Sequence, residues 1–120
     1  MRKQLQDDDP GLAPPPPSDS RALLVAIDED WGATDLALTL SCADGKPVGL
    51  AYLGGYSAGS ELDGLGRDAV ALVDMMLALG IAPTRIAHSM STRQLFDGTA
   101  LPGSMLAAIV TAIQDETARP

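Results

Sequence analysis

Apolar residues recur at alternating spacings of three and four between positions 54 and 80, in the segment around which the rest of the chain is organised. The repeating positions are Leu62, Leu65, Ala69, Leu72, Met76 and Leu79. Charged residues fall between them, which is typical of an amphipathic helix. Ser60 stands where an N-cap is expected, and Gly80 followed by Pro83 supplies stop signals. We expect Leu72 and Met76 at the centre of the sheet-facing stripe, so that Leu72→Ala would destabilise the fold by roughly 2–5 kcal/mol.

Two alternating segments and one apolar run precede this helix and predict three strands. The apolar positions are Leu36, Leu38, Leu40 and Cys42 in the first segment and Val48, Leu50 and Tyr52 in the second. Asp44-Gly45 lies between them, and an Asp-Gly pair flanked by alternating runs is a strong hairpin signal. The earlier run at residues 22–27, A-L-L-V-A-I, is short enough for a third strand.

Helical signals follow the central segment. Pro83-Thr84 opens a short helix in which Ile86 and Met90 share a face, and residues 91–99 are expected to form a loop around Asp97-Gly98. A last helix starts after residues 102–104, P-G-S, and its buried stripe comprises Met105, Leu106, Ile109, Val110 and Ile113. Strands first and helices afterwards predict an α+β fold, an antiparallel three-stranded meander followed by two or three helices packed on one face.

The first twenty residues have a different composition. They hold three consecutive aspartates and a run of four prolines but almost no large apolar side chains. Such a segment cannot bury enough surface to offset the entropy of ordering, so we expect a disordered tail at residues 1–20 and a single domain at residues 21–117.

Charge and composition exclude several classes of function. The net charge is −8 at pH 7 and aromatic residues make up 3% of the chain, so autonomous binding to nucleic acid or to an anionic membrane is not expected. The single cysteine, Cys42, excludes an internal disulfide. No apolar run is long enough for a signal peptide or a membrane span, which predicts a cytoplasmic protein.

The glycine-rich segment before the central helix is the candidate site for a small anion. It leads from a strand into a helix N-terminus, where backbone N–H groups favour negative charge. The candidate ligand-binding residues are Gly55, Ser57, Gly59, Ser60 and Arg67. Glu61 and Asp63 already place negative charge in the first helical turn, and an ordinary glycine-rich turn is the alternative.

The remaining chemistry-bearing residues predict no catalytic site, no cofactor and no metal. The one imidazole, His88, has no local partner for a triad or a metal, and Cys42 is expected to be a buried, inert thiol. Asp63, Arg67 and Asp74 share a helical face, which predicts a solvated row of ion pairs. Residues 28–30, D-E-D, diverge in an extended loop and do not form a cation cage. The position of Trp31, in the core or exposed, stays open.

From residue 32 to residue 113 the layout resembles the TSCPD domain, a module found at the C-terminus of cobalamin-dependent ribonucleotide reductases and in short stand-alone bacterial proteins. The matching segments are D-G-K-P, A-G-S-E-L-D-G-L-G-R-D-A-V-A-L, M-L-A-L-G-I, T-R-I-A-H-S-M-S and L-P-G-S-M-L-A-A-I, and the residues shared with stand-alone members are Gly59, Ser60, Leu62, Asp63, Arg67, Asp68 and Gly80. In element order alone, the chain is also distantly similar to NifU-like iron–sulfur scaffolds.

The resemblance implies a link to ribonucleotide reduction but not the reaction itself. Where reductase-attached members and the scaffolds have cysteines, this chain has G-Y-S at 55–57 and S-M-S at 89–91. Two functions therefore stay open. The first is an accessory or regulatory module of nucleotide metabolism and DNA synthesis, acting on a reductase or a small anionic ligand. The second is a protein-interaction domain that self-associates, for instance as a homodimer, through leftover apolar helix surface, with Met75, Met76 and Met90 as contact residues.

Overall fold

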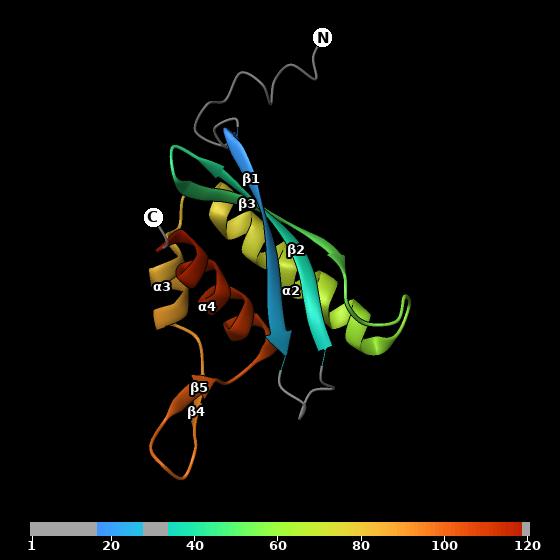
Figure 1. The fold of residues 1–120 in the computed structure, drawn as a ribbon, viewed down its shortest axis with the longest axis vertical. Coiled ribbons are helices and arrows are strands. Elements are labelled where there is room, and N and C mark those ends of the chain that lie inside the picture. Colours follow the sequence, from blue (N-terminus) through green and yellow to red (C-terminus); the bar gives the residue numbers. More distant parts are fainter. Residues whose placement is uncertain (1–16, 28–33, 119–120) are drawn as a thin grey trace.

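The computed structural model describes residues 17–27 and 34–118 of the chain. A three-stranded antiparallel sheet comes first, in the order β1-β2-β3, and helices follow it (Figure 1). The elements are β1 (Asp19–Ile27), β2 (Thr34–Ala43), β3 (Lys46–Gly54), α2 (Glu61–Ala78), α3 (Pro83–His88), β4 (Thr92–Gln94), β5 (Ala100–Pro102) and α4 (Met105–Thr117). The predicted α+β class and the three-stranded meander are confirmed. Most of the predicted tail and the expectations for residues 28–31 lie outside the described residues.

The sheet follows the alternation of the sequence. Every second side chain is buried from Leu23 to Ile27 in β1 and from Leu36 to Cys42 in β2, and so is Leu50 of β3, because these positions share one face of the sheet. The β2–β3 turn consists of Asp44 and Gly45, whose φ angles of 53° and 79° are those of a tight hairpin turn. The hairpin predicted at this pair is confirmed.

Helices α2 and α4 lie side by side on the same face of the sheet, α2 against β3 and α4 against β1 (Figure 1). Helix α3 packs against α4. The core lies between this helical layer and the sheet, and its fully buried large side chains are Leu36, Leu38, Leu40, Leu77, Ile109, Ile113, Val73 and Val110. The predicted stripe of α4 is confirmed at Ile109, Val110 and Ile113, whereas Met105 and Leu106 are only partly buried.

The helix ends predicted from the sequence are also observed. The Ser60 hydroxyl caps α2 by accepting a hydrogen bond from the backbone N–H of Asp63, at 3.1 Å. Gly80 follows the helix with a φ of 85°, a left-handed conformation that favours glycine. Ser104 caps α4 in the same way through the N–H of Ala107.

The buried face of α2 differs from the predicted stripe. Leu72 is 49% exposed, and its neighbour Val73 is fully buried. The helix buries Ala69, Val70, Val73 and Leu77, so its rotation about its own axis is offset by about one residue, or roughly 100°, from the prediction. The expectation that Leu72 is the centre of the core-facing stripe is therefore wrong.

Two aspartates of α2 explain this rotation. The carboxylate of Asp63 accepts a hydrogen bond from the Tyr52 hydroxyl at 2.8 Å, and that of Asp74 accepts one from the backbone N–H of Leu50, also at 2.8 Å. Both partners belong to β3, so the two bonds turn one side of the helix toward that strand. The prediction of a solvated ion-pair row is wrong for these aspartates, because Asp63 is only 4% exposed and Asp74 is part-buried.

Gly66 permits the close approach of α2 to β3. A Cβ atom at this position would lie 3.1 Å from the Tyr52 ring, which is tighter than an ordinary contact. A glycine inside a helix is normally unfavourable. Here it makes room for the aromatic ring whose hydroxyl binds Asp63.

A small hairpin replaces part of the predicted loop. Strands β4 and β5 pair in antiparallel register and extend away from the body of the domain (Figure 1). The turn contains Asp97 and Gly98 as expected, but the three-residue strands are too short to produce a recognisable alternation. Phe96 near the tip is fully exposed.

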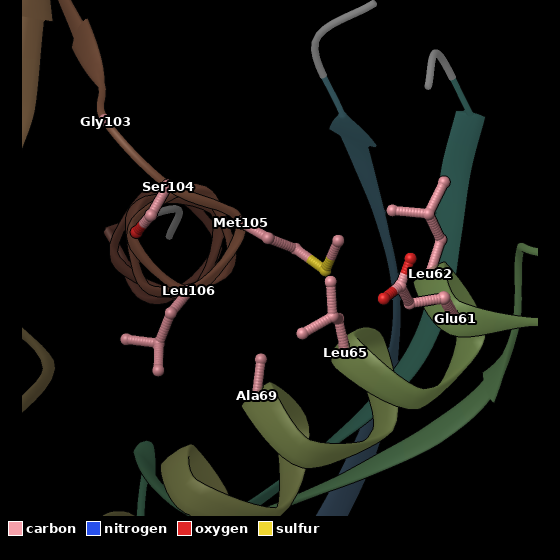
Figure 2. A pocket seen from close by; sticks show the side chains of 8 residues that line it. All are labelled: Glu61, Leu62, Leu65, Ala69, Gly103, Ser104, Met105 and Leu106. Carbon is pink, nitrogen blue, oxygen red and sulfur yellow. The ribbon is translucent and has the colours of Figure 1, made fainter. Parts of the chain in front are cut away.

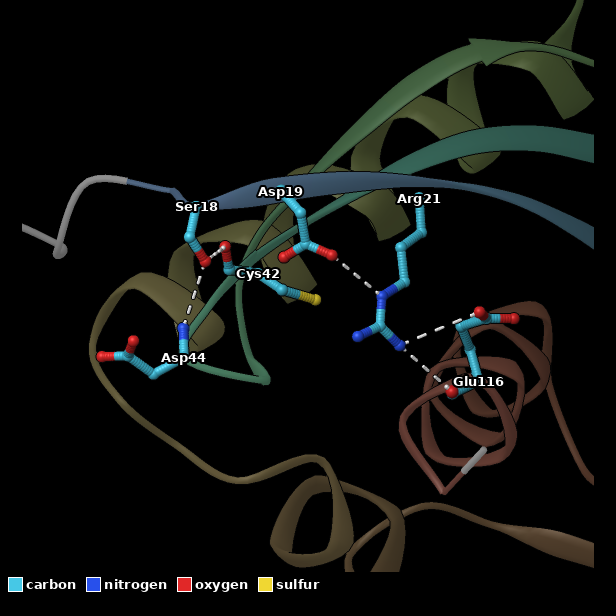
Figure 3. A network of polar contacts seen from close by, with 6 residues as sticks. All are labelled: Ser18, Asp19, Arg21, Cys42, Asp44 and Glu116. Carbon is cyan, nitrogen blue, oxygen red and sulfur yellow. Dashed lines mark hydrogen bonds and ion pairs between the residues drawn. The ribbon is translucent and has the colours of Figure 1, made fainter. Parts of the chain in front are cut away.

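The start of β1 is bonded to the neighbouring strand β2 with its turn and to helix α4 (Figure 3). Ser18 hydrogen bonds to the carbonyl of Cys42 and accepts from the N–H of Asp44. Arg21 pairs with Asp19 at 3.3 Å and reaches the carbonyl of Glu116 on α4 at 3.4 Å. Ordered structure therefore begins before residue 21, the predicted start of the domain.

The rotation of α2 makes opposite predictions for two leucines. We expect Leu77→Ala to lower the free energy of unfolding by about 2–5 kcal/mol, because Leu77 is 1% exposed and its loss leaves a cavity. Leu72→Ala is expected to lower it by less than about 1 kcal/mol, since surface changes are small. Urea unfolding of both variants measures the difference, and a larger loss for Leu72→Ala would contradict the observed rotation.

Candidate functional site

The candidate ligand-binding residues lie together in the loop between β3 and α2 and in the first turns of α2. Four of their backbone groups form hydrogen bonds, either within this segment or to the start of β2. The N–H of Gly59 donates to the Asp63 carboxylate at 3.1 Å, the N–H of Ser60 donates to the carbonyl of Ser57 at 3.0 Å, and the carbonyl of Gly55 accepts from the Thr34 hydroxyl at 3.2 Å. Two of the donors expected to face an anion, the N–H groups of Gly59 and Ser60, are thus engaged with the protein itself.

Asp63 is the centre of this segment. Its carboxylate accepts from the Tyr52 hydroxyl, from the N–H of Gly59 and from Nε of Arg67 at 3.0 Å. The pKa of Asp63 lies below its ordinary value of 3.8, because Arg67, then Tyr52 and then the Gly59 N–H stabilise the charged form. Burial and the hydrogen bond to Asp63 in turn raise the pKa of Tyr52. Asp63 therefore occupies the position that an anionic ligand would take at this helix N-terminus.

Arg67 completes the cluster from the solvent side. Its guanidinium carbon lies 4.9 Å from the centroid of the Tyr52 ring, a cation–π arrangement, and its side chain is 58% exposed. The structure thus brings three of the predicted residues, Gly59, Ser60 and Arg67, into contact with Asp63, an aspartate that the sequence placed in an exposed row. Anion binding at this loop stays a prediction that depends on the exposed part of Arg67.

The other candidates for chemistry lie apart from this cluster. His88 is exposed at the end of α3, and Cys42 is fully buried in β2. Burial raises the pKa of the Cys42 thiol, which disfavours the reactive thiolate. In residues 17–27 and 34–118, no cluster of three or more His, Cys, Asp or Glu side chains could hold a metal ion.

A row of exposed apolar side chains on α2 includes Met75, which the sequence analysis named as a contact residue, and three leucines that it assigned to the core. We call it the apolar ridge, and it consists of Leu65, Leu72, Met75 and Leu79, which are 49–65% exposed. The signal was present in the sequence, because apolar residues cover about half of the circumference of α2. A helix in a two-layer fold buries only one side. An apolar arc as broad as this one therefore extends beyond the buried side, and part of it is exposed to solvent.

A groove runs beside the ridge, between the first half of α2 and the start of α4 (Figure 2). It has a volume of about 720 Å³ and is lined by Glu61, Leu62, Leu65, Ala69, Gly103, Ser104, Met105 and Leu106. Figure 2 shows the Met105 side chain extending from α4 toward Leu65. Ridge and groove share Leu65 and so form one apolar surface on the helical layer.

Comparison with known proteins found no matching family model, no matching curated protein and no matching solved structure. The resemblance to the TSCPD domain rests on the sequence motifs alone. Within the described part of the chain, no helix is both long and apolar enough to cross a membrane.

The lowered pKa of Asp63 predicts a dependence of stability on pH. Because the folded-state pKa is depressed, this carboxylate stabilises the fold above its unfolded pKa of about 4, and the contribution is lost as the pH falls through the folded pKa. We expect Asp63→Asn to unfold more easily than wild type at pH 7 and to lose less stability between pH 5 and pH 2.

Urea titrations across this range measure the effect, and Asp68→Asn, which removes an exposed carboxylate from the same helix, is the matched control. Parallel pH profiles for wild type and Asp63→Asn would show that the cluster does not stabilise the charged carboxylate.

Proposed function

We propose that this domain is an interaction module that binds an amphipathic helix of a partner protein through the apolar ridge and the adjoining groove. The observation that carries the proposal is the exposure of Leu65, Leu72, Met75 and Leu79 on one helix. Their combined exposed area is on the order of 400 Å², within the range of the largest apolar patches on monomeric proteins, which are often functional.

The spacing of the ridge favours a helical partner. Leu65, Leu72 and Leu79 are seven residues apart, and the a/d-like repeat of the sequence continues through Leu62, Ala69 and Met76. Heptad spacing presents apolar side chains along one line, which suits the apolar face of a second helix. Methionines at the border, Met75 and Met105, adapt easily to the side chains of a partner.

Charge favours a basic partner. Glu61 lines the groove, and Asp68 is exposed on α2 between Leu65 and Leu72. The chain carries a net charge of −8. A second copy docked in parallel on the same surface would bring acidic residues together, whereas lysine or arginine beside the apolar positions of a partner helix would complement them.

The sequence resemblance supports one partner to test first. TSCPD-like domains occur with ribonucleotide reductases, so we propose that the module acts as an accessory or regulatory component of nucleotide metabolism in the cytoplasm. The reductase would supply the catalytic residues. The support for this identity is the set of motifs around Ser60, Asp63 and Arg67, which is separate from the support for the docking surface.

A designed peptide tests the docking surface without knowledge of the partner. We expect a three-heptad helical peptide with leucine at the apolar positions and lysine beside them to bind the domain, and the same peptide with glutamate in place of lysine not to bind. Leu72→Glu should weaken binding at least tenfold, measured by fluorescence anisotropy. Leu95→Glu is the matched control, because Leu95 is 46% exposed and lies in the β4–β5 hairpin.

The sign of the Leu72→Glu effect separates docking from simple charge attraction. If a cationic peptide bound only to the acidic surface, an added glutamate would strengthen binding. Equal or tighter binding by Leu72→Glu, or equal binding of the glutamate peptide, would refute the proposed surface.

A further inference from the structure

The two edges of the three-stranded sheet differ in how they are protected. β3 contains Pro47, which has no N–H to donate, and its pairing with β2 shifts register twice. The N–H of Leu50 donates to the Asp74 carboxylate of α2 at 2.8 Å, so it is not available to a further strand. Proline, bulges and a covering helix are devices that prevent an edge strand from pairing with another chain. The β3 edge is therefore closed.

The β1 edge has none of these devices. β1 pairs with β2 over nine consecutive residues, from Asp19 to Ile27, without proline and without a shift of register. Within residues 17–27 and 34–118, no other strand pairs with β1 on its far side. Every second N–H and C=O of an edge strand points away from the sheet, which makes such an edge a template for an added strand. The edge of β1 is thus long, regular and open.

A groove lies along this open edge, between β1 and the last turns of α4, and has a volume of about 410 Å³. Its lining residues are Ala22, Leu23, Leu24, Ala112, Asp115 and Glu116. Arg21 extends from β1 toward α4 beside this groove, and its guanidinium lies 3.4 Å from the carbonyl and 3.9 Å from the carboxylate of Glu116 (Figure 3). A basic side chain on a strand can therefore reach the end of α4.

The end of α4 that borders the groove attracts cations. Asp115 and Glu116 lie in its last turn, which contains no basic residue. A helix C-terminus carries partial negative charge, so two carboxylates there are unfavourable until a cation compensates them. Glu116 faces Arg21, whereas Asp115 is exposed and forms no ion pair within the described parts of the chain. The groove therefore has room and charge for a further basic side chain at Asp115.

We propose that the β1 edge binds an extended segment of a partner protein in which basic and apolar residues alternate. The segment lies about 4.8 Å from β1 as an added strand and exchanges backbone hydrogen bonds with it. Successive side chains of the segment point to opposite faces of the sheet. Those on the helical side enter the groove, where lysine or arginine meets Asp115. Those on the other side lie beside Ala22 and Leu24, which are both exposed, and are apolar.

Charge disfavours a second copy of the chain at this edge. The groove lies beside the middle of β1, so two β1 strands paired about a two-fold axis would bring Asp115 and Glu116 of both chains together. Each chain also carries a net charge of −8. The site is separate from the apolar ridge, because it is built from β1 and α4 and takes a strand. The proposal therefore does not rest on the proposed function.

A fluorescent peptide of four lysine–valine repeats tests the site on the full chain. We expect it to bind, as measured by fluorescence anisotropy, and we expect the same peptide with glutamate in place of lysine not to bind. Asp115→Lys should weaken binding at least fivefold. Asp68→Lys is the matched control, because Asp68 is an exposed carboxylate beside the ridge, and it should change the affinity less than twofold. Circular dichroism verifies that both variants are folded.

Hydrogen exchange shows whether the bound peptide is an added strand. At saturating peptide, every second amide proton of β1 should exchange at least tenfold more slowly, and the amide protons of β3 should not change. N-methylation of the peptide gives a second measurement. Only every second residue of a strand donates toward one neighbour, so methylation at all lysines and methylation at all valines should have opposite outcomes. One of these peptides should lose binding and the other should keep it.

Absence of binding, unchanged exchange at β1, or equal affinities of the two methylated peptides would overturn the proposal. So would an equal effect of Asp115→Lys and Asp68→Lys. A loss of binding in Asp68→Lys alone would place the peptide on the ridge instead. Protection of β1 in the free chain that rises with protein concentration would show a second copy at the edge, which also contradicts the proposal.

Discussion

Two hydrogen-bonded aspartates fix how the central helix lies on the sheet, and most of the surface of the domain follows from them. Asp63 binds the hydroxyl of Tyr52, and Asp74, three turns later, binds the backbone N–H of Leu50. A carboxylate that is removed from water needs such a partner, and both aspartates have one. In this orientation α2 buries Ala69, Val70, Val73 and Leu77 against the sheet, and the apolar ridge is left in solvent.

The fold could be predicted from the sequence wherever the spacing of apolar residues followed a single period, that of a strand or that of a helix. Strict alternation located β2 and β3, Asp44-Gly45 located their turn, and Ser60 and Ser104 marked the starts of two helices. The α2 stripe could not be placed in the same way. Its apolar residues cover a broad arc, and periodicity alone does not tell which half of that arc packs against the sheet.

The candidate site shows the same limit. Asp63 and Arg67 were recognised as helical neighbours, but the tertiary partners Tyr52 and Leu50 are not visible in the spacing along the helix. The β4–β5 hairpin was missed because strands of three residues carry too little pattern. The small outward-facing residues of β2, in contrast, follow directly from the residues that alternate with its core leucines.

The apolar ridge is bordered by the acidic side chains of Glu61 and Asp68, which is why the proposed partner is a basic amphipathic helix.

The rotation of α2 is the central claim, and solvent paramagnetic relaxation of side-chain methyl groups measures it most directly. With a soluble gadolinium chelate in a dilute sample, the methyl signals of Leu65, Leu72 and Leu79 should broaden strongly, whereas those of Val70, Val73 and Leu77 should stay sharp. The opposite pattern, with Leu72 protected and Val73 exposed, would show that the helix packs through its heptad stripe and would contradict the account.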